Sequence, residues 1–301
     1  MKNSDARRSY HYRVVDVFTQ HPLEGNALAV FTNASGLSDQ TMQRIAREMN
    51  LAETTFVFPA TRPDCAAALR IFTPSKELAF AGHPTIGTAF VLLENGVVRR
   101  GAGRFSLEEK VGPVAIRVEA GEPSRIWLRT PPIEYGTTYE RSACAGALGL
   151  RADDLLDVTP QLVSAGNPTV FVGVKDERAV DRAWLDSRGM QVLKGSGGAD
   201  RDSFCVFVFA PTATGAYSRL FAPDYGIPED PATGSSTGPL ASFMMRHGLA
   251  SSAAGTRFVS EQGTTMGRRS LLYVEVFGER GADGIDVGGY VSPVAACVMT
   301  L

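Results

Sequence analysis

The chain nearly repeats itself, and this repetition constrains its fold more than any other feature of the sequence. The run Arg70-Ile-Phe-Thr-Pro-Ser leads into Gly82-His-Pro-Thr, and 149 residues after Arg70 the run Arg219-Leu-Phe-Ala-Pro-Asp leads into Asp230-Pro-Ala-Thr-Gly-Ser. A second echo links Gly25-Asn-Ala with Gly166-Asn-Pro. The offset is close to half of the 301 residues, so the pattern favours two similar lobes. The alternatives are one compact domain and chance recurrence of short apolar patterns that contain proline and glycine.

Segments rich in valine, phenylalanine and isoleucine predict that much of the chain is β-sheet. They are Tyr12–Phe18, Ala27–Phe31, Thr55–Phe58, Ala67–Phe72, Thr169–Val174, Phe204–Phe209 and Leu271–Phe277. A parallel sheet needs a helical crossover between nearly every strand pair, and few helical patterns interrupt these segments, so we expect largely antiparallel sheets. The predicted fold class is α+β. We place the N-terminal lobe at residues 1–126 and the C-terminal lobe at 127–289, with 290–301 as a candidate strand to complete the first lobe.

Three segments have helical patterns. Ser38–Asn50 carries apolar residues at helical spacing, and Ser38 is suited to cap its start. Pro84–Asn95 begins with proline and is followed by glycine, and Ser235–His247 is also followed by glycine. The last two each follow a strand and a turn. If the lobes face each other, two helix N-termini with free N–H groups point into one cleft, which favours an anionic ligand.

Composition and motifs exclude several classes of function. The net charge of -2, with acidic and basic residues intermixed, offers no field for a polyanion, so we expect no nucleic-acid partner. The polar N-terminus and the lack of a long apolar run predict a cytoplasmic protein without membrane contact. The sequence contains no G-x-G-x-x-G after a strand, no P-loop and no G-x-S-x-G, and the four histidines lack metal-ligand spacing, so we expect neither a phosphate cofactor nor a metal.

The four cysteines are widely spaced and form no C-x-x-C pair, so we interpret them as reduced thiols. Cys205 and Cys297 lie in apolar strand-like runs, and we expect both to be buried structural thiols.

Three ionisable residues stand among glycine, proline or threonine, where exposure is expected: Glu53, His83 and Asp230. Each alone has a simpler interpretation. Glu53 could be a solvated or capping residue, Asp230 could cap its helix, and His83 could be a turn histidine with satisfied hydrogen bonds.

Several longer motifs occur together and in order along the chain. They are Val15-Asp-Val-Phe, Leu23-Glu-Gly-Asn-Ala, Arg47-Glu-Met-Asn-Leu-Ala-Glu-Thr-Thr-Phe-Val, Arg70-Ile-Phe-Thr-Pro, Phe80-Ala-Gly-His-Pro-Thr and Glu229-Asp-Pro-Ala-Thr-Gly-Ser. In these motifs the chain resembles the phenazine-biosynthesis-like family. The resemblance implies a diaminopimelate-epimerase-like fold, in which two pseudosymmetric lobes each wrap a mostly antiparallel sheet around a central helix and the active site lies between them.

The resemblance also implies roles for individual residues. Glu53 matches the family's catalytic acid/base, and His83 and Asp230 match catalytic residues that support it. Gly82, Gly234 and Ser235 match substrate-binding positions. Thiol-dependent epimerases of this fold place a cysteine at each central helix N-terminus, whereas this chain has His83 and the Asp230 segment there. A two-cysteine racemase mechanism is therefore not expected.

We expect a cofactor-independent isomerase that shifts a proton within a small carboxylate-bearing substrate, with trans-2,3-dihydro-3-hydroxyanthranilate as a candidate. The resemblance further implies a homodimer. Three alternatives remain open at this point. They are an isomerase or epimerase of the same fold with another substrate, a metabolite-binding protein without catalysis, and a scaffold protein that uses a sheet edge.

Overall fold

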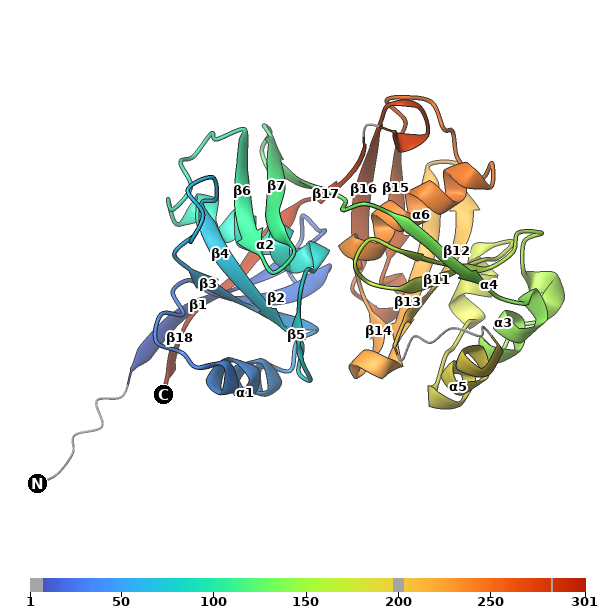
Figure 1. Ribbon diagram of the computed structural model, residues 1–301, viewed down its shortest axis with the longest axis horizontal. Helices are drawn as coiled ribbons and strands as arrows, with labels where there is room; N and C mark the ends of the chain where they lie inside the picture. Colours follow the sequence, from blue (N-terminus) through green and yellow to red (C-terminus); the bar gives the residue numbers. More distant parts are fainter. Residues whose placement is uncertain (1–7, 197–202, 283) are drawn as a thin grey trace, which may run out of the picture.

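The computed structural model describes residues 8–196, 203–282 and 284–301. Figure 1 shows two lobes side by side, each built largely of strands around one helix. The first lobe contains β1 (Ser9–Val17), β2 (Asn26–Phe31), α1 (Asp39–Met49), β3 (Glu53–Phe58), β4 (Ala67–Phe72), β5 (Glu77–Leu78), α2 (Gly82–Glu94), β6 (Arg104–Glu109), β7 (Gly112–Glu119) and β8 (Arg125–Arg129).

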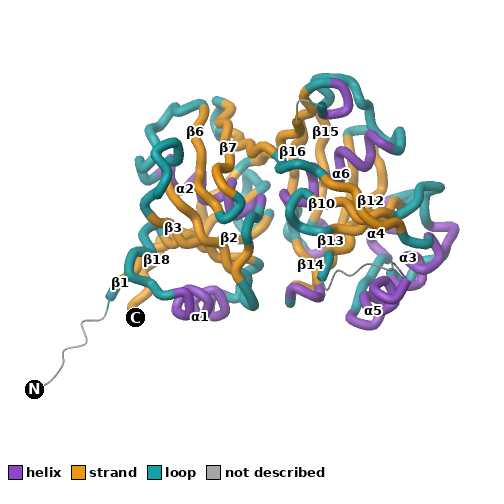
Figure 2. The backbone as a smooth tube through the Cα atoms, in the orientation of Figure 1, coloured by secondary structure: helices purple, strands orange, loops and turns teal. Residues whose placement is uncertain are grey.

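The second lobe begins with β9 (Glu134–Thr138), α3 (Arg141–Ala147), β10 (Gln161–Ser164), β11 (Thr169–Gly173), α4 (Glu177–Arg182) and α5 (Ser187–Ser196). It continues with β12 (Cys205–Thr212), β13 (Gly215–Ala222), β14 (Ile227–Asp230), α6 (Gly234–Arg246), β15 (Arg257–Gln262), β16 (Ser270–Phe277) and β17 (Gly284–Gly289), before β18 (Val291–Thr300) ends the chain. Figure 2 shows how strongly strands dominate over helices.

The two lobes have the same order of strand pairings, so the sequence repeat is also a repeat of topology. In the first lobe β2 pairs with β3 and β4 with β6 in parallel. In the second lobe β11 pairs with β12 and β13 with β15 in parallel. Each parallel pair has a helix between its strands, as a parallel connection requires, and the other pairings of the described strands are antiparallel. The predicted α+β fold with two pseudosymmetric, largely antiparallel lobes is confirmed.

The chain exchanges strands between the lobes. After β8 it crosses to the second lobe as β9, which pairs with β10, and after β17 it returns as β18, which pairs with β1. The two lobes are also joined directly, because β8 pairs with β7 on one side and with β17 on the other. The boundary drawn after residue 126 falls inside β8, which belongs to this shared part of the sheet.

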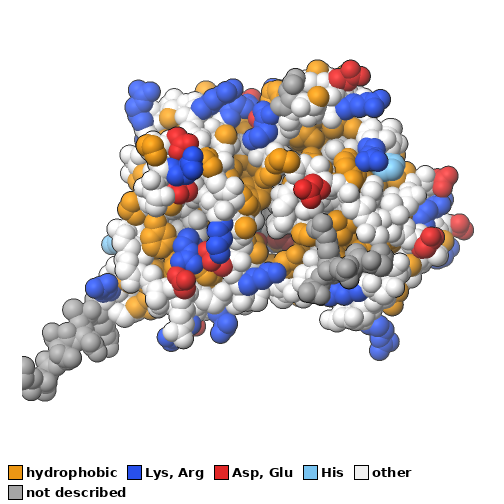
Figure 3. Space-filling view, in the orientation of Figure 1, with side chains coloured by type: hydrophobic (Ala, Val, Ile, Leu, Met, Phe, Trp, Pro, Cys, Tyr) orange, Lys and Arg blue, Asp and Glu red, His pale blue; other side chains and the backbone are white. Residues whose placement is uncertain are grey.

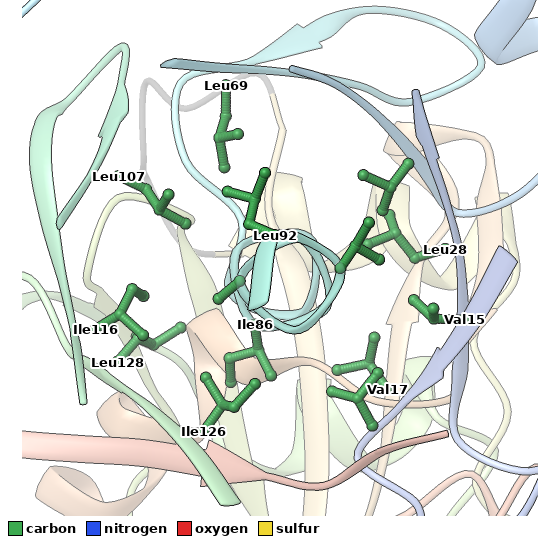
Figure 4. Packing of buried hydrophobic residues seen from close by; sticks show 14 of the residues in the cluster. Val15, Val17, Leu28, Leu69, Ile86, Leu92, Leu107, Ile116, Ile126 and Leu128 are labelled. Atoms are coloured by element: carbon green, nitrogen blue, oxygen red, sulfur yellow. The ribbon is translucent and has the colours of Figure 1, made fainter. Parts of the chain in front are cut away.

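Two central helices organise the two main cores. Figure 4 shows Val15, Val17, Leu28, Leu69 and Leu107 among the apolar side chains that surround α2. A Cβ at Gly87, in the middle of α2, would lie 2.7 Å from a methyl group of Leu28, so the small residue lets the sheet close on the helix. In the second lobe Leu240 and Phe243 of α6 pack on phenylalanines of β11 and β12. Each fully buried side chain of this kind contributes about 1.5–3 kcal/mol.

The predicted helices are present, with corrected N-terminal ends. Ser38 caps α1, where its side chain accepts from the Thr41 N–H. α2 begins at Gly82 rather than Pro84, so the proline occupies the third helical position. Its missing N–H costs nothing there, because the first N–H groups of a helix have no intrahelical acceptor. α6 likewise begins at Gly234, one residue before the predicted Ser235.

The surface on the face seen in Figure 3 carries acidic and basic side chains interspersed. None of the described helices is long and apolar enough to cross a membrane.

Candidate active site

The N-termini of α2 and α6 meet between the two lobes, and two glycines permit this approach. A Cβ added to Gly82 would lie 2.8 Å from the carbonyl carbon of Gly234 and from the backbone nitrogen of Ser235. A Cβ added to Gly234 would lie 2.9 Å from the ring of Phe18. A larger residue at position 82 would push the helix ends apart, whereas at position 234 it would press on the Phe18 ring.

A cleft opens at this meeting point. It is lined by Glu53, Thr73, Leu78, Ala81, Gly82, His83, Asn167, Cys205, Leu220, Ala222, Tyr225, Ile227, Asp230, Thr233, Gly234, Ser235 and Ser236. The structure therefore brings together all six predicted site residues. Among the described residues that line the cleft there is no lysine or arginine, so an anionic ligand group has only backbone N–H groups, neutral donors and helix dipoles to bind.

Glu53 and His83 face each other in the cleft. Glu53 is the first residue of β3, and His83 is the second residue of α2. The Oε2 atom of Glu53 lies 3.4 Å from the Nε2 atom of His83, and the two side chains are only 13% and 4% exposed. Both atoms are buried, and neither has a well-oriented hydrogen-bond partner within the described protein. Glu53 is thus not a solvated residue, and His83 is not a turn histidine with satisfied hydrogen bonds.

Asn26, at the start of β2, connects His83 to the other lobe. Its Nδ2 atom donates to Oδ1 of Asp230 at 2.8 Å and to the carbonyl of Ala232 at 3.0 Å, and it lies 3.3 Å from Nδ1 of His83. Because two of these neighbours can only accept, the amide orientation is fixed with its NH₂ group toward them. Both hydrogens of the NH₂ group are taken by these two acceptors, and an amide nitrogen cannot accept, so Nδ1 of His83 carries no proton. The proton of the neutral imidazole therefore resides on Nε2, the ring nitrogen nearer Glu53.

Asp230 ends β14 and does not cap α6. Its Oδ2 atom accepts from the hydroxyl of Thr233, its Oδ1 atom accepts from Asn26, and its backbone carbonyl accepts from Nε2 of Gln262 at 2.7 Å. The N-cap of α6 is Thr233. The carboxylate is therefore held in one orientation at the floor of the cleft, with lone pairs left for a ligand.

Burial sets the protonation of these three groups. It raises the pKa of Glu53 well above the ordinary value, and the nearby charge of Asp230 raises it further. Burial lowers the pKa of His83 to about 3, so the imidazole is neutral. Burial raises the pKa of Asp230 to about 6, against the lowering effect of the hydrogen bonds from Thr233 and Asn26. Perturbed groups gathered in one cleft are typical of acid/base sites.

The second lobe contains a counterpart of the pair formed by Asn26 and His83. Asn167, just before β11, donates from Nδ2 to the hydroxyl of Ser235 at 3.1 Å, and Ser235 is the second residue of α6. Sequence reasoning missed both asparagines as site residues. The signal was present, since the repeated Gly-Asn pairs at positions 25–26 and 166–167 mark equivalent points of the two lobes.

The cysteines do not form a reactive pair. All four are free thiols, and Cys205, which lines the cleft, is 8% exposed and has its pKa raised by burial. The expectation for Cys297 was wrong. It is only partly buried, because the outer part of β18 lies at the surface. No group of three or more His, Cys, Asp or Glu side chains within the described ranges is placed to hold a metal ion.

Comparison with known proteins shows the family to which this chain belongs. The family model described as phenazine biosynthesis-like protein matches residues 15–296. A trans-2,3-dihydro-3-hydroxyanthranilate isomerase from Pseudomonas chlororaphis is 37% identical over 89% of this chain and 91% of its own. An uncharacterized isomerase from Escherichia coli strain K12 is 31% identical over 89% of both chains.

Solved structures agree with this relationship. A predicted epimerase from Pseudomonas aeruginosa is 34% identical, with a TM-score of 0.80 over 96% of this chain and 99% of that one. A hydroxyproline epimerase from Agrobacterium vitis is 14% identical, with a TM-score of 0.66 over 98% and 93% of the two chains, which shows a shared fold. The predicted likeness to epimerase folds is thereby confirmed.

Proposed function

Because the chain belongs to the phenazine biosynthesis-like protein family, we propose that it is an isomerase that moves a proton within a small carboxylate-bearing substrate, with Glu53 as general acid/base. One observation carries this proposal. The buried Oε2 atom of Glu53 lies in the cleft without a well-oriented partner and faces the Nε2 atom of His83. An uncommitted buried carboxyl group with a raised pKa is suited both to remove a proton and to return it.

The substrate we propose is trans-2,3-dihydro-3-hydroxyanthranilate, the compound in the names of three relatives that are 35–37% identical. This molecule has a carboxylate, an amine and a hydroxyl group. Asp230 supplies an acceptor for the amine, and His83 supplies the Nε2–H donor. The alternative is another small metabolite with the same groups, and a substrate assay distinguishes the two.

The substrate carboxylate would bind at the N-terminus of α6. The third residue of α2 is Pro84, which has no N–H, so the first turn of α2 offers fewer donors than that of α6. The first two N–H groups of α6 are those of Gly234 and Ser235. The hydroxyl of Ser235 accepts a hydrogen bond from the Asn167 side chain. A helix N-terminus with these donors and no Cβ at Gly234 lets a carboxylate approach the backbone.

In the reaction, ionised Glu53 removes a proton from a C–H that an adjacent double bond makes acidic. It then returns a proton to a different carbon, which completes the isomerisation without a net change in the enzyme. His83 and Asp230 keep the substrate oriented toward Glu53. A positioned acid/base of this kind contributes a factor on the order of 10²–10⁴ in rate.

Proton NMR of trans-2,3-dihydro-3-hydroxyanthranilate in D₂O tests the proposed substrate and separates catalysis from binding. Loss of substrate signals with deuterium entering the product supports the isomerase. Binding without any exchange of C–H groups would instead favour a metabolite-binding protein. The homodimer stays a prediction, which sedimentation velocity of the purified protein would test.

A further inference from the structure

Glu109 is a buried carboxyl group that the proposed mechanism does not use. It ends β6, is 5% exposed, and lies behind the first turn of α2. The other buried acids of the described residues outside the cleft are Asp16, Glu275 and Asp286, and each has an arginine partner. Glu109 differs from them, because its partner is the hydroxyl of Thr85 and its Oε2 atom has none within the described protein.

Counting hydrogens around Thr85 indicates which group holds the proton. The Oγ1 atom of Thr85 lies 2.7 Å from the carbonyl oxygen of Ala81 and 2.5 Å from Oε1 of Glu109. A hydroxyl group has one hydrogen, and the carbonyl of Ala81 can only accept. If Thr85 donates to Ala81, the hydrogen in the second contact must come from Glu109. A neutral Glu109 thus satisfies both contacts, whereas an ionised Glu109 would take the Thr85 hydrogen away from Ala81.

No charged side chain on the neighbouring elements is positioned to neutralise an ionised Glu109. Those elements are α2, β4 and β7. The titratable and charged residues of these elements, of β6 and of the turn after β6 have other partners, except Arg104, which lies at the far end of β6. They are His83 facing Glu53, Glu94 with Arg100, Arg70 with Glu77 and Asp39, Arg117 with Glu275 and Asp286, Glu119 with Arg125, Glu108 with Thr61, Lys110 with Glu77, and Arg104 at the start of β6. Burial raises the pKa of Glu109 to about 8, against the lowering effect of hydrogen bonds from Thr85 and the Ala81 backbone.

We propose that Glu109 is a positioning residue that, as a neutral carboxylic acid, holds the turn from Ala81 to Thr85 and so presents Gly82 and His83 to the cleft. The turn contains the residue that contacts Gly234 and the imidazole that faces Glu53. Ionisation of Glu109 would release the Ala81 carbonyl from Thr85. It would also place a negative charge near the cleft, where repulsion between like charges opposes binding of an anionic substrate.

The first test needs no substrate. The ¹³C carboxyl resonance of Glu109, assigned by its loss in Glu109→Gln, is expected to show a neutral acid at about pH 6 and to titrate near pH 8. The ¹⁵N resonances of the His83 ring should match wild type in Glu109→Gln and shift in Glu109→Leu. A carboxylate signal at about pH 6, or an unmoved His83 ring in Glu109→Leu, would overturn the proposal.

The second test is kinetic and rests on the proposed function. We expect kcat/KM of Glu109→Gln within about twofold of wild type near pH 7, and at least a tenfold loss in Glu109→Leu. The KM of wild type should rise above about pH 8 while that of Glu109→Gln stays level, with partly exposed Glu108→Gln as a control that behaves like wild type. Equal losses in the Gln and Leu variants would overturn the proposal. If wild type fails to turn over this substrate, the proposed substrate fails and the NMR test still decides the role of Glu109.

Discussion

The Nε2 atom of His83 lies 3.4 Å from the Oε2 atom of Glu53, and Asn26 contacts the opposite edge of the same imidazole ring. This arrangement gives the histidine one tautomer and fixes the orientation of its ring. The N–H of the neutral ring lies on the side of Glu53 and the cleft, where it has no well-oriented partner among the described residues. Asn26 also donates to Asp230 from the second lobe, so one amide group aligns parts of the site from both halves of the chain.

Replacing the two equivalent asparagines should produce different kinetic effects. In Asn26→Ala the His83 tautomer is no longer fixed and Asp230 loses a donor, so we expect kcat to fall about 10- to 100-fold. In Asn167→Ala the hydroxyl of Ser235 loses its donor, so the main expected effect is a rise in KM. Steady-state kinetics of both variants measures this split. A larger loss of kcat in Asn167→Ala than in Asn26→Ala would contradict it.

Alanine at Gly82 should be more damaging than alanine at Gly234. The added methyl group at Gly82 would meet backbone atoms at 2.8 Å, which cannot move away independently, whereas at Gly234 it would meet the end of the Phe18 ring at 2.9 Å. We expect Gly82→Ala to lower the free energy of unfolding by about 1–3 kcal/mol and to widen the helix contact. Urea unfolding measures the cost. Gly146→Ala is the control, because the methyl group there meets nothing within 4 Å.

The pH profile should show an acidic limb that belongs to the carboxyl pair. Glu53 must be ionised to remove a proton, and burial with the charge of Asp230 raises its pKa above the ordinary 4.5, so kcat/KM should fall as pH drops through that raised pKa. The Glu53 and Asp230 titrations are coupled. Burial lowers the pKa of His83 to about 3, so this residue should add no limb near neutral pH. A limb that disappears in His83→Gln would show that this assignment is wrong.

The two lobes contain equivalent ion pairs that should differ in energy. Arg219 pairs with Glu229, and the side chains are 8% and 9% exposed, while Arg70 pairs with Glu77 at 30% and 17% exposure. Removing one partner of a buried pair costs about 3–5 kcal/mol, and the cost falls as solvent reaches the pair. We therefore expect Arg219→Met to destabilise the protein much more than Arg70→Met in urea unfolding. Equal costs would mean that burial does not separate the two pairs.

The repeat in the sequence predicted two similar lobes, and the family resemblance added a sheet around a central helix in each. Arg70 and Arg219 occupy equivalent strands, β4 and β13, and the helices that follow them meet at Gly82 and Gly234. Short sequence patterns predicted these elements. The apolar runs typical of strands, and the glycines and prolines at helix ends, agree with the fold that forms. The strands around Arg104–Glu119 were not predicted, because charged and polar residues interrupt their apolar pattern.

The repeated Gly-Asn pairs marked Asn26 and Asn167, but the contacts of the supporting residues could not be assigned from the sequence. Asn26 contacts Asp230 across 204 residues, and Glu109 contacts Thr85 across 24 residues. Neither contact has a local signal, because each depends on which strand end and which helix end the fold brings together. The same holds for the pKa of Glu109, since a glutamate in a charged run reads as exposed until burial is known.

The most direct test of the account is isomerisation of trans-2,3-dihydro-3-hydroxyanthranilate in D₂O by Glu53→Gln beside wild type. The amide keeps the size of the side chain but cannot accept and return the proton. We expect Glu53→Gln to lose at least a factor on the order of 10² in kcat and to incorporate no deuterium, while the Glu108→Gln control, outside the cleft, behaves like wild type. Turnover by Glu53→Gln within a few-fold of wild type would contradict the assignment of Glu53 as the acid/base.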